Sequence, residues 1–266
     1  MRDLEDAHRT YRDELVRHGL LLSMGVDGLY GRSGDFERVV EGINFAVSAM
    51  GDPDKPEVMR FPPGIGKWQM DKSGYPKSFP QLAGTVHSFD GGDKEHRTLV
   101  AQLEKGEEWT TGLKTTAVSL TPAACYGVYP VMAARGPLKP EGALVDVFGF
   151  CFRHEPSLDP ARLQMFRQRE HVRLGTADQA LKFRQLWIDR GKAMMEALAL
   201  PHAVDVANDP FFGRVGKMMA SNQIEDALKF EVLVPITSTE VPTACVSFNY
   251  HRDQFGTTWS LKTASG

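Results

Sequence analysis

The stretch FRHEPSLDPARLQMFRQRE, residues 152–170, decides the fold of this chain. It has the pattern of two strands joined by a short turn that contains two prolines. Arg153 and Glu155 stand two positions apart, so on a strand their side chains point to the same face. Phe166 lies on the expected return strand, and Glu170 lies at its far end. A guanidinium in this position can hold a phosphate, and an aromatic ring opposite it can stack on a flat base. The residues alone leave open a surface ion pair and a core phenylalanine, which are the commoner roles.

Length and composition are those of an ordinary globular protein. The chain has 266 residues, of which 42% are hydrophobic and 24% charged, and its formal net charge is −3. This charge gives no general attraction to nucleic acid. The first residues, MRDLEDAHRTYRDELVRHG, lack the apolar segment of a signal peptide, and the longest apolar run, GALVDVFGFCF, is too short to span a bilayer. Three scattered cysteines do not describe a disulfide framework, so we expect a cytoplasmic protein without a membrane segment.

The first half of the chain reads as helices separated by glycine-rich and proline-rich segments. The spacing of apolar residues predicts a helix over residues 3–19, capped by Asp3, and a second helix from about Phe36. EVMRFPPGIG has the pattern of a short strand that its prolines stop, and DKSGYPKSFPQLAG that of a loop. KEHRTLVAQLEKG is expected to be helical.

From Trp109 onward the pattern changes to short apolar or alternating segments bounded by glycine and proline. We expect strands within TTAVSLTPAACYGVYPVMA, GALVDVFGFCFRHE, FRQREHVRLG, LKFEVLVPI and TACVSFNYH. Between them, Thr176 and Gln179 form a capping-box pattern that begins a long helix, which Pro201 ends. We therefore predict one α+β domain over residues 1–266, with a six- or seven-stranded, mostly antiparallel sheet flanked by helices.

Spacing alone identifies no catalytic centre. The patterns GxSxG, GxxxxGK[ST] and HExxH are absent, and the glycines of GVDGLYGRSG do not match GxGxxG. Cys125 follows an apolar run in LTPAACYG, and a lone cysteine in such a place is most often a small, buried apolar residue. Cys125 and Glu170 are 45 positions apart, which is not a zinc-binding spacing.

Several motifs together resemble the class II aminoacyl-tRNA synthetases, and seryl-tRNA synthetase in particular. FRHE resembles the FRxE of motif 2, and RLQMFRQRE resembles its return strand, with Arg162, Phe166 and Glu170 in register. LTPAAC resembles the Thr-Ala-Glu loop that binds the amino group, with Cys125 in place of the glutamate. ALKFEVLVPI and TACVSFNYHRDQFG resemble the strand pair that binds magnesium and ATP.

The resemblance extends over nearly the whole chain to the amino acid:[carrier protein] ligases of bacteria, which are truncated seryl-synthetase homologues. RFPPGIGKWQMDKSGYPKSFPQLAG and NDPFFGRVGKMMASNQIEDALKFEVLVPI both resemble that family. The resemblance implies ATP-dependent activation of a small amino acid, glycine or alanine, as its adenylate. The acceptor it implies is the phosphopantetheine thiol of a carrier protein.

The resemblance also implies roles for the hairpin residues in ATP binding. Arg153 corresponds to the arginine that binds the α-phosphate of ATP, and it is the expected catalytic residue. Glu155 and Phe166 correspond to the adenine contacts. Glu240 and Asn249 are the candidates for the magnesium and ATP ligands.

A zinc site follows from the same resemblance. Cys125 and Glu170 correspond to two zinc ligands, and the zinc would take the substrate amino group at its open position. The family has a third ligand, a cysteine, in a C-terminal motif 3, which also carries an arginine. The present sequence stops at TTWSLKTASG, where that motif is expected to begin. We therefore expect these 266 residues to lack motif 3, either as a fragment or as a degenerate member of the family. We read Cys245 as a core cysteine.

We expect a homodimer that pairs through EVMRFPPG, which resembles motif 1, and an acceptor that is not tRNA. The chain has no heptad repeat for a tRNA-binding coiled coil, its motif-2 loop PSLDPA is short, and its net charge is negative. The helix from Thr176 to Leu200 is our expected docking surface for the carrier. Two alternatives stay open: a non-catalytic or degenerate class II paralogue, and a seryl-type tRNA-charging enzyme.

Overall fold

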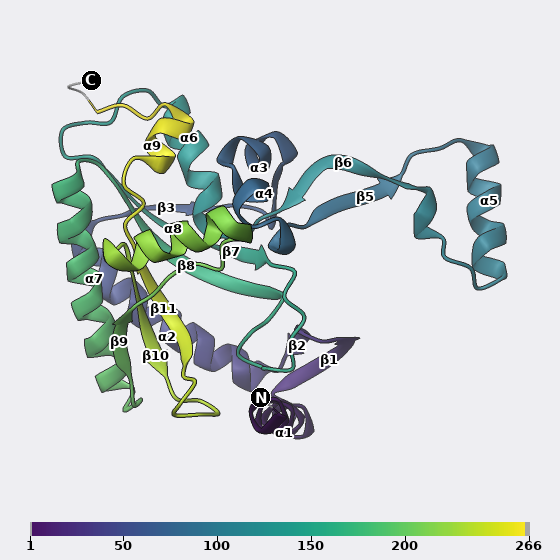
Figure 1. Ribbon diagram of the computed structural model, residues 1–266, viewed down its shortest axis with the longest axis horizontal. Helices are drawn as coiled ribbons and strands as arrows, with labels where there is room; N and C mark the ends of the chain where they lie inside the picture. The colour runs from purple at the N-terminus through teal and green to yellow at the C-terminus, as the bar shows by residue number, and fades with distance from the viewer. Residues whose placement is uncertain (1, 264–266) are drawn as a thin grey trace.

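The computed structural model describes residues 2–263, and it contains helices packed around several small sheets (Figure 1). The strands are β1 (Leu21–Val26), β2 (Leu29–Arg32), β3 (Glu57–Arg60), β4 (Gly64–Gly66), β5 (Thr85–Phe89), β6 (Leu113–Leu120), β7 (Ala143–Phe152), β8 (Met165–Leu174), β9 (Ala203–Val206), β10 (Lys229–Val234) and β11 (Thr243–Asn249). The α-helices are α1 (Arg2–Arg17), α2 (Gly34–Gly51), α3 (Lys67–Ser73), α4 (Tyr75–Ser78), α5 (Asp93–Glu104), α6 (Val128–Ala134), α7 (Ala177–Ala197), α8 (Gly213–Glu225) and α9 (Gln254–Trp259). Short 3₁₀ helices are η1 (Asp52–Asp54), η2 (Pro80–Leu82), η3 (Thr110–Gly112) and η4 (Ala124–Gly127).

The centre of the fold is the hairpin of β7 and β8, as the opening stretch of sequence predicts. The two strands are antiparallel and paired without a break from Ala143↔Leu174 to Phe152↔Met165. β3 pairs with β7 on its other side, and this pairing is parallel. Within the described residues, hydrogen bonds divide the strands into the sheets β3-β7-β8, β11-β10-β9, β4-β6-β5 and β1-β2. The α+β architecture is confirmed, but these smaller sheets replace the single six- or seven-stranded sheet that we expected.

The two faces of β7 differ in character because side chains alternate along a strand. Val145 and Val147 are fully buried on one face, where they pack in the main core with residues of α6 and α9. Asp146 points to the opposite face and is only 4% exposed. There Arg169 of β8 donates to the Asp146 carboxylate and also to the Ser48 hydroxyl of α2. The buried ion pair therefore joins the sheet to α2.

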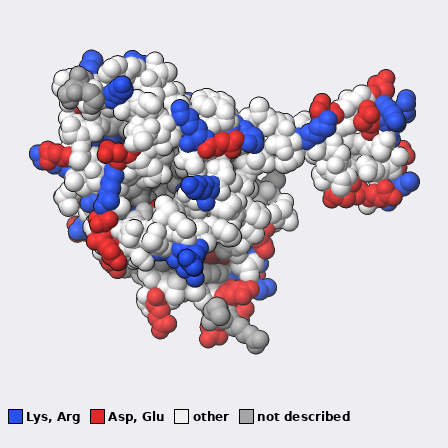
Figure 2. All heavy atoms as spheres, turned by 45° about the horizontal axis from the view of Figure 1, so that its top comes forward, with Lys and Arg blue, Asp and Glu red and all other residues white. Residues whose placement is uncertain are grey.

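A long β-ribbon leaves the body of the molecule and carries α5 at its tip (Figure 1). β5 and β6 pair from Thr85↔Ser119 to Phe89↔Leu113, and no residue of α5 is buried. Figure 2 shows that acidic and basic side chains are mixed on this projection. Among the described residues, no helix is long and apolar enough to cross a membrane.

The structure corrects four local expectations. Asp3 lies in the first turn of α1 and does not precede it. The expected loop DKSGYPKSFPQLAG contains the end of α3, α4 and η2, and Gly74 lies between the two helices with φ of +75°. The expected strand over residues 115–133 ends at Leu120, and η4 and α6 follow it. The long helix has the predicted Thr176 cap but ends at Ala197, before Pro201.

Candidate functional site

Arg153 follows β7 directly, and its guanidinium is held on two sides. Its Nε donates to the carbonyl of Pro122 at 3.0 Å, and its Cζ lies 5.3 Å from the centre of the Phe166 ring. Its backbone N–H donates to the carbonyl of Gln164 at 3.0 Å, which closes the loop between β7 and β8. Within residues 2–263, the two terminal nitrogens of Arg153 have no hydrogen-bond partner. A fixed guanidinium with two free donors is suited to binding an anion.

Glu155 lies in the same loop, and its carboxylate is paired. Arg162 Nη1 donates to Glu155 Oε1 at 2.9 Å, and the two side chains are 59% and 25% exposed, respectively. The pair spans the loop near the Arg153 guanidinium. The expected ATP residues Arg153, Glu155 and Phe166 thus belong to one end of the hairpin, and Arg162 joins them.

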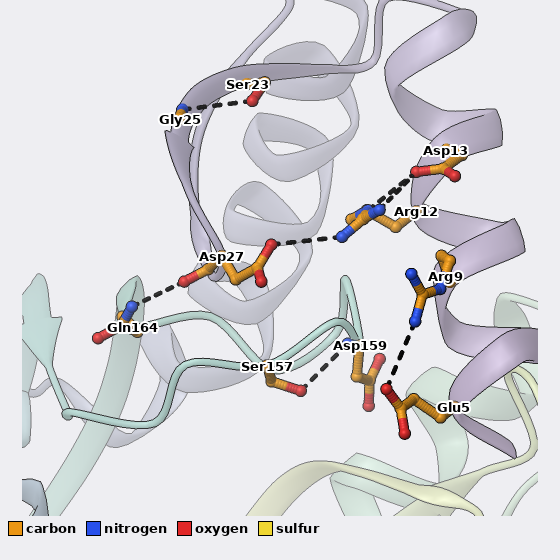
Figure 3. Close-up of polar contacts among 10 residues, drawn as sticks. All are labelled: Glu5, Arg9, Arg12, Asp13, Ser23, Gly25, Asp27, Ser157, Asp159 and Gln164. Atoms are coloured by element: carbon orange, nitrogen blue, oxygen red, sulfur yellow. Dashed lines mark hydrogen bonds and ion pairs between the residues drawn. The ribbon is translucent and has the colours of Figure 1, made fainter. Parts of the chain in front are cut away.

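The N-terminal hairpin holds this loop from outside (Figure 3). Gln164 is 7% exposed, its Nε2 donates to the carbonyl of Asp27 at 2.7 Å, and its N–H donates to the carbonyl of Gly28 at 2.8 Å. Gly28 has φ of +78°, and a Cβ atom there would lie 3.0 Å from Gln164 Cγ. His8 of α1 lies 3.8 Å from the carboxylate of Asp159 in the loop. The motif-2 loop is therefore clamped by α1 and the β1–β2 turn.

Figure 3 also shows a polar cluster beside this clamp. Arg12 of α1 donates to Asp13 at 2.8 Å and to Asp27 at 3.3 Å. A cavity of about 290 Å³ is lined by α1 and the β1–β2 hairpin, including Arg12, Asp27 and Tyr30. None of the residues that the sequence singled out lines it.

Cys125 and Glu170 lie together, as the resemblance implied. The backbone N–H of Cys125, in η4, donates to Glu170 Oε1 at 3.1 Å. Burial raises the pKa of the Cys125 thiol well above its usual value, and the neighbouring Glu170 carboxylate raises it further, while a hydrogen bond with Tyr129 opposes this. Burial also raises the pKa of Glu170, against the hydrogen bonds from Cys125.

A thiolate and a carboxylate in such a place repel one another, and a divalent cation would relieve both charges. The donor pair therefore fits two ligands of a zinc site. No group of three or more His, Cys, Asp and Glu side chains that could hold a metal occurs in the described part of the chain. The pair accordingly makes at most part of a coordination sphere.

Gln168 of β8 supports the Cys125 loop, a role that no sequence pattern indicates. Its Oε1 accepts from the N–H of Ala124 at 3.3 Å and from the thiol of Cys151 at 3.4 Å. Burial, together with the charge of Glu170, raises the pKa of Cys151 to about 12. Cys151 is therefore a neutral packing residue beside the Cys125–Glu170 pair.

Two tyrosines that sequence reasoning also missed border the site. Tyr75 and Tyr126 meet edge to face, with ring centres 5.7 Å apart. Burial raises the pKa of Tyr126 well above its usual value, Cys125 and Tyr75 raise it further, and the positive charge of Arg153 opposes them. Tyr126 therefore lies between the cysteine loop and the guanidinium. A tyrosine within an expected loop carries no local signal of such a position.

In the described part of the chain, Glu240 and Asn249 form hydrogen bonds with neighbours in sequence. Glu240 is exposed in the connection between β10 and β11, where its N–H donates to Ser238 Oγ at 3.1 Å. Asn249 is exposed at the end of β11, and its Nδ2 donates to Ser247 Oγ at 3.1 Å. In the described part of the chain, neither side chain contacts Arg153. Their roles stay predictions.

The reading of Cys245 as a core residue is wrong. Cys245 is exposed, with its thiol 3.7 Å from the carbonyl of Thr243. β11 is an edge strand, and Val246 and Phe248 are the residues that pack against the second core cluster. Because side chains alternate, Cys245 faces the other way.

A buried charge cluster lies on the neighbouring strand β10 and was not expected. Lys229 is 8% exposed, and its Nζ lies 2.7 Å from the Asp209 carboxylate and 2.8 Å from that of Glu231. Gln223 Nε2 donates to the other oxygen of Asp209 at 2.8 Å. Despite burial, these partners lower the pKa of Asp209, so its carboxylate is charged at neutral pH.

Comparison with solved structures shows the fold. The seryl-tRNA synthetase (SerRS) of M. kandleri, in complex with A. aeolicus tRNASec, superposes with a TM-score of 0.79 and 20% identity over 96% of this chain and 52% of that chain. The cytoplasmic serine-tRNA ligase of Naegleria fowleri, in complex with AMP, gives a TM-score of 0.66 and 14% identity over 97% of this chain and 55% of that chain. At these identities the likeness establishes a class II synthetase fold and nothing further.

Comparison of sequences shows the family, although no family model matches the chain. Amino acid--[acyl-carrier-protein] ligase 1 of Bradyrhizobium diazoefficiens is 47% identical over 247 residues, covering 93% of this chain and 76% of the relative. Ligase 2 of the same organism is 48% identical over 247 residues, covering 93% of this chain and 74% of the relative. Arg153, Phe166 and Glu170 lie on or beside the β7–β8 hairpin, and Cys125 of η4 contacts Glu170. With this site and this identity over about three quarters of each relative, the chain belongs to the amino acid–[acyl-carrier-protein] ligase family.

Proposed function

We propose that this protein uses ATP to activate an amino acid as its aminoacyl-adenylate and then transfers the aminoacyl group to an acyl-carrier protein. The observation that carries the proposal is the β7–β8 hairpin, which has a guanidinium suited to anion binding at its loop end and the Cys125–Glu170 pair beside β8. Membership in the ligase family supports the same reaction.

In the first step, a carboxylate oxygen of the amino acid attacks the α-phosphorus of ATP, and pyrophosphate leaves. This reaction needs alignment and neutralisation of negative charge more than a covalent intermediate. The two free terminal nitrogens of Arg153 can donate to the α-phosphate, while Nε stays on the carbonyl of Pro122. The Phe166 ring offers a stacking surface for adenine beside that guanidinium. Glu155, held by Arg162, is the candidate for hydrogen bonding to the base.

Cys125 and Glu170 are the proposed residues for the amino group of the substrate, through zinc. Zinc bound there would supply a Lewis-acid position for a neutral amine. Cys125 and Tyr129 are 6% and 4% exposed, so core residues border this site. We propose glycine or alanine as the amino acid, as the family resemblance implies. Magnesium, for which Glu240 and Asn249 are the proposed ligands, would neutralise the phosphates of ATP.

In the second step, a thiolate attacks the carbonyl carbon of the adenylate, and AMP leaves. We propose that this thiol is the phosphopantetheine thiol of a holo carrier protein and that tRNA is not the acceptor. The net charge of −3 supports this choice, because tRNA binding depends on contacts between phosphates and basic side chains. The helix α7 remains our proposed docking surface for the carrier.

We also propose a homodimer that pairs through α2 and β3. Large apolar side chains are exposed on both elements: Val39 is 64% exposed, Phe45 77% and Val58 62%. Exposed apolar residues gathered on neighbouring elements are typical of protein interfaces. Sedimentation at micromolar concentration should give about twice the chain mass of 29.5 kDa.

The central experiment measures ATP–pyrophosphate exchange with glycine, alanine and serine offered one at a time. Radiolabelled amino acid is then offered with ATP to a holo carrier protein, the apo carrier protein and tRNA. We expect exchange with a small amino acid and label on the holo carrier as a thioester that hydroxylamine releases. Absence of exchange would refute the adenylate reaction. Label on tRNA, or equal label on the apo carrier, would refute the proposed acceptor.

A separate experiment tests the zinc proposal without relying on activity. Zinc content is measured by elemental analysis in the wild type and in Cys125→Ser and Glu170→Gln. Cys245→Ser is the matched control, because Cys245 is exposed on an edge strand. Zinc should fall in the first two variants and be unchanged in the control. Equal zinc in all four proteins would refute the assignment.

A further inference from the structure

Tyr75 carries a buried hydroxyl that has no partner. The side chain belongs to a residue only 6% exposed, and its Oη forms no hydrogen bond within the described residues. An unsatisfied donor in a protein interior destabilises the fold, and such groups are few in native structures. Phenylalanine would fill the same space without that cost. The hydroxyl therefore calls for a partner from outside the chain.

The ring of Tyr75 is fixed, so the hydroxyl cannot turn away to find a partner. Its centre lies 5.1 Å from that of Phe79 and 5.7 Å from that of Tyr126. The backbone N–H of Tyr75 donates to Ser73 Oγ at 3.2 Å, and α4 begins directly after Gly74. The direction of the hydroxyl is thus set by packing before any ligand arrives.

The groups around the hydroxyl are those of the proposed active site. Burial raises the pKa of Tyr75 to about 12, and the charged neighbours that act on it are, in order, Arg153, Glu155 and Asp209, followed by Cys151. Arg153 and Glu155 belong to the hairpin end proposed to bind ATP. Tyr75 also packs in one cluster with Leu82, whose carbonyl accepts from the N–H of His154, the residue after Arg153, at 3.1 Å. Tyr75 therefore borders the end of the hairpin that carries Arg153. At neutral pH the phenol keeps its proton and can only donate to an anionic oxygen.

We propose that Tyr75 is a substrate-contacting residue whose hydroxyl donates a hydrogen bond to an oxygen of the acyl-phosphate group that Arg153 binds. This inference rests on the proposed adenylate-forming function. Arg153 supplies charge at this group, and Tyr75 supplies a neutral, directed donor from another part of the chain. Because that donor is fixed before substrate binds, it costs no reorganisation during the reaction.

The test compares Tyr75→Phe with wild type and with Tyr11→Phe, a control in α1, where Tyr11 is 38% exposed. The first measurement is kcat/KM for amino-acid-dependent pyrophosphate exchange. Loss of one hydrogen bond to a charged oxygen should lower it by about 10- to 100-fold in Tyr75→Phe. The melting temperature without ligand should stay the same or rise, because an unsatisfied group is removed. Tyr11→Phe should match wild type in both measurements.

The second measurement is calorimetric binding of glycyl-sulfamoyl-adenosine, an unreactive analogue of the adenylate, with AMP as a reference ligand. Tyr75→Phe should bind the analogue about tenfold more weakly and should bind AMP less tightly by a smaller factor. Exchange and analogue binding within twofold of wild type would overturn the role of Tyr75. If wild type binds the analogue but gives no exchange, the proposed function fails. The role of Tyr75 is then judged by comparing the affinity of Tyr75→Phe and of wild type for the analogue. If wild type binds neither ligand, both proposals fall.

Discussion

Replacing Gln164 with methionine removes one side-chain hydrogen bond from the clamp on the motif-2 loop while nearly keeping the side-chain volume. The lost bond joins Gln164 Nε2 to the carbonyl of Asp27 over 2.7 Å. Gln164 is 7% exposed whereas Asp27 is exposed, so water can replace part of the lost bond, and the cost is about 0.5–1.5 kcal/mol. The main-chain bond from Gln164 to Gly28 remains. Gln164 is thus expected to act as a positioning residue for Arg153, whose N–H donates to the Gln164 carbonyl.

A weaker clamp lets the loop leave its binding-competent arrangement. If the other loop arrangements are together about as populated as the binding-competent one, a loss of about 1.4 kcal/mol raises their weight about tenfold, and apparent ATP affinity falls by about fivefold. We therefore expect the KM for ATP to rise several-fold in Gln164→Met, while kcat at saturating ATP changes less than twofold, in pyrophosphate exchange. Gln185→Met in α7 is the control, because its side chain is exposed and bonds only to Asp189 at 3.1 Å. A KM for ATP equal to that of wild type, in a variant that is measurably less stable, would refute the positioning role.

Three further predictions follow from the same geometry. Arg153→Lys should lower adenylate formation by about 100-fold, because an ammonium cannot keep the Pro122 bond and still offer two donors to phosphate; an exchange rate near that of wild type would contradict this. Val58→Asp should shift sedimentation from dimer to monomer, since a charge on this exposed strand residue opposes an apolar interface, and an unchanged dimer would argue for another contact. Burial lowers the pKa of His171 from its usual 6.5 to about 4, so the folded protein resists protonation. The neutral His171 side chain contributes fully to the free energy of unfolding above about pH 6.5, and this contribution is lost as the pH falls toward 4. The loss is about 1–2 kcal/mol after allowance for the partial exposure of the side chain. In His171→Phe, the free energy of unfolding measured in urea should fall less between neutral pH and about pH 4.5 than in wild type. The same dependence on pH in both proteins would contradict this role of His171.

The parts of the fold that sequence predicts well are those where local pattern and burial agree. The β7–β8 hairpin alternates in the expected way, and Thr176 with Gln179 forms the capping box that begins α7. The segment around Tyr75 was misread as a loop because its glycines and prolines favour turns, whereas packing against Phe79 and Tyr126 stabilises short helices there. α8 was not predicted, because its helical pattern is weak in a segment with two glycines.

The sequence predicts the part of the candidate site that lies on the hairpin better than the part that other segments contribute. Arg153, Phe166 and Glu170 are in register on two paired strands, so their relation follows from strand geometry. Cys125 reaches Glu170 only because the chain after β6 turns into η4, and no spacing rule gives that contact. The Tyr75 hydroxyl is visible only through its burial and missing partner, which are tertiary properties.

The parallel pairing of β3 with β7 affects how the chain reaches its native state. Arg60 of β3 donates to the carbonyl of Asp146 on β7 across 86 positions of sequence. During synthesis, β3 emerges well before its partner strand, so Met59, which is 8% exposed in the folded chain, stays unprotected until β7 has left the ribosome. The β7–β8 hairpin closes locally, and only then can β3 add to its edge. Non-local parallel pairing is slow because loop closure precedes the stabilising contacts. The exposed early segment is therefore where aggregation or chaperone binding should concentrate during biosynthesis.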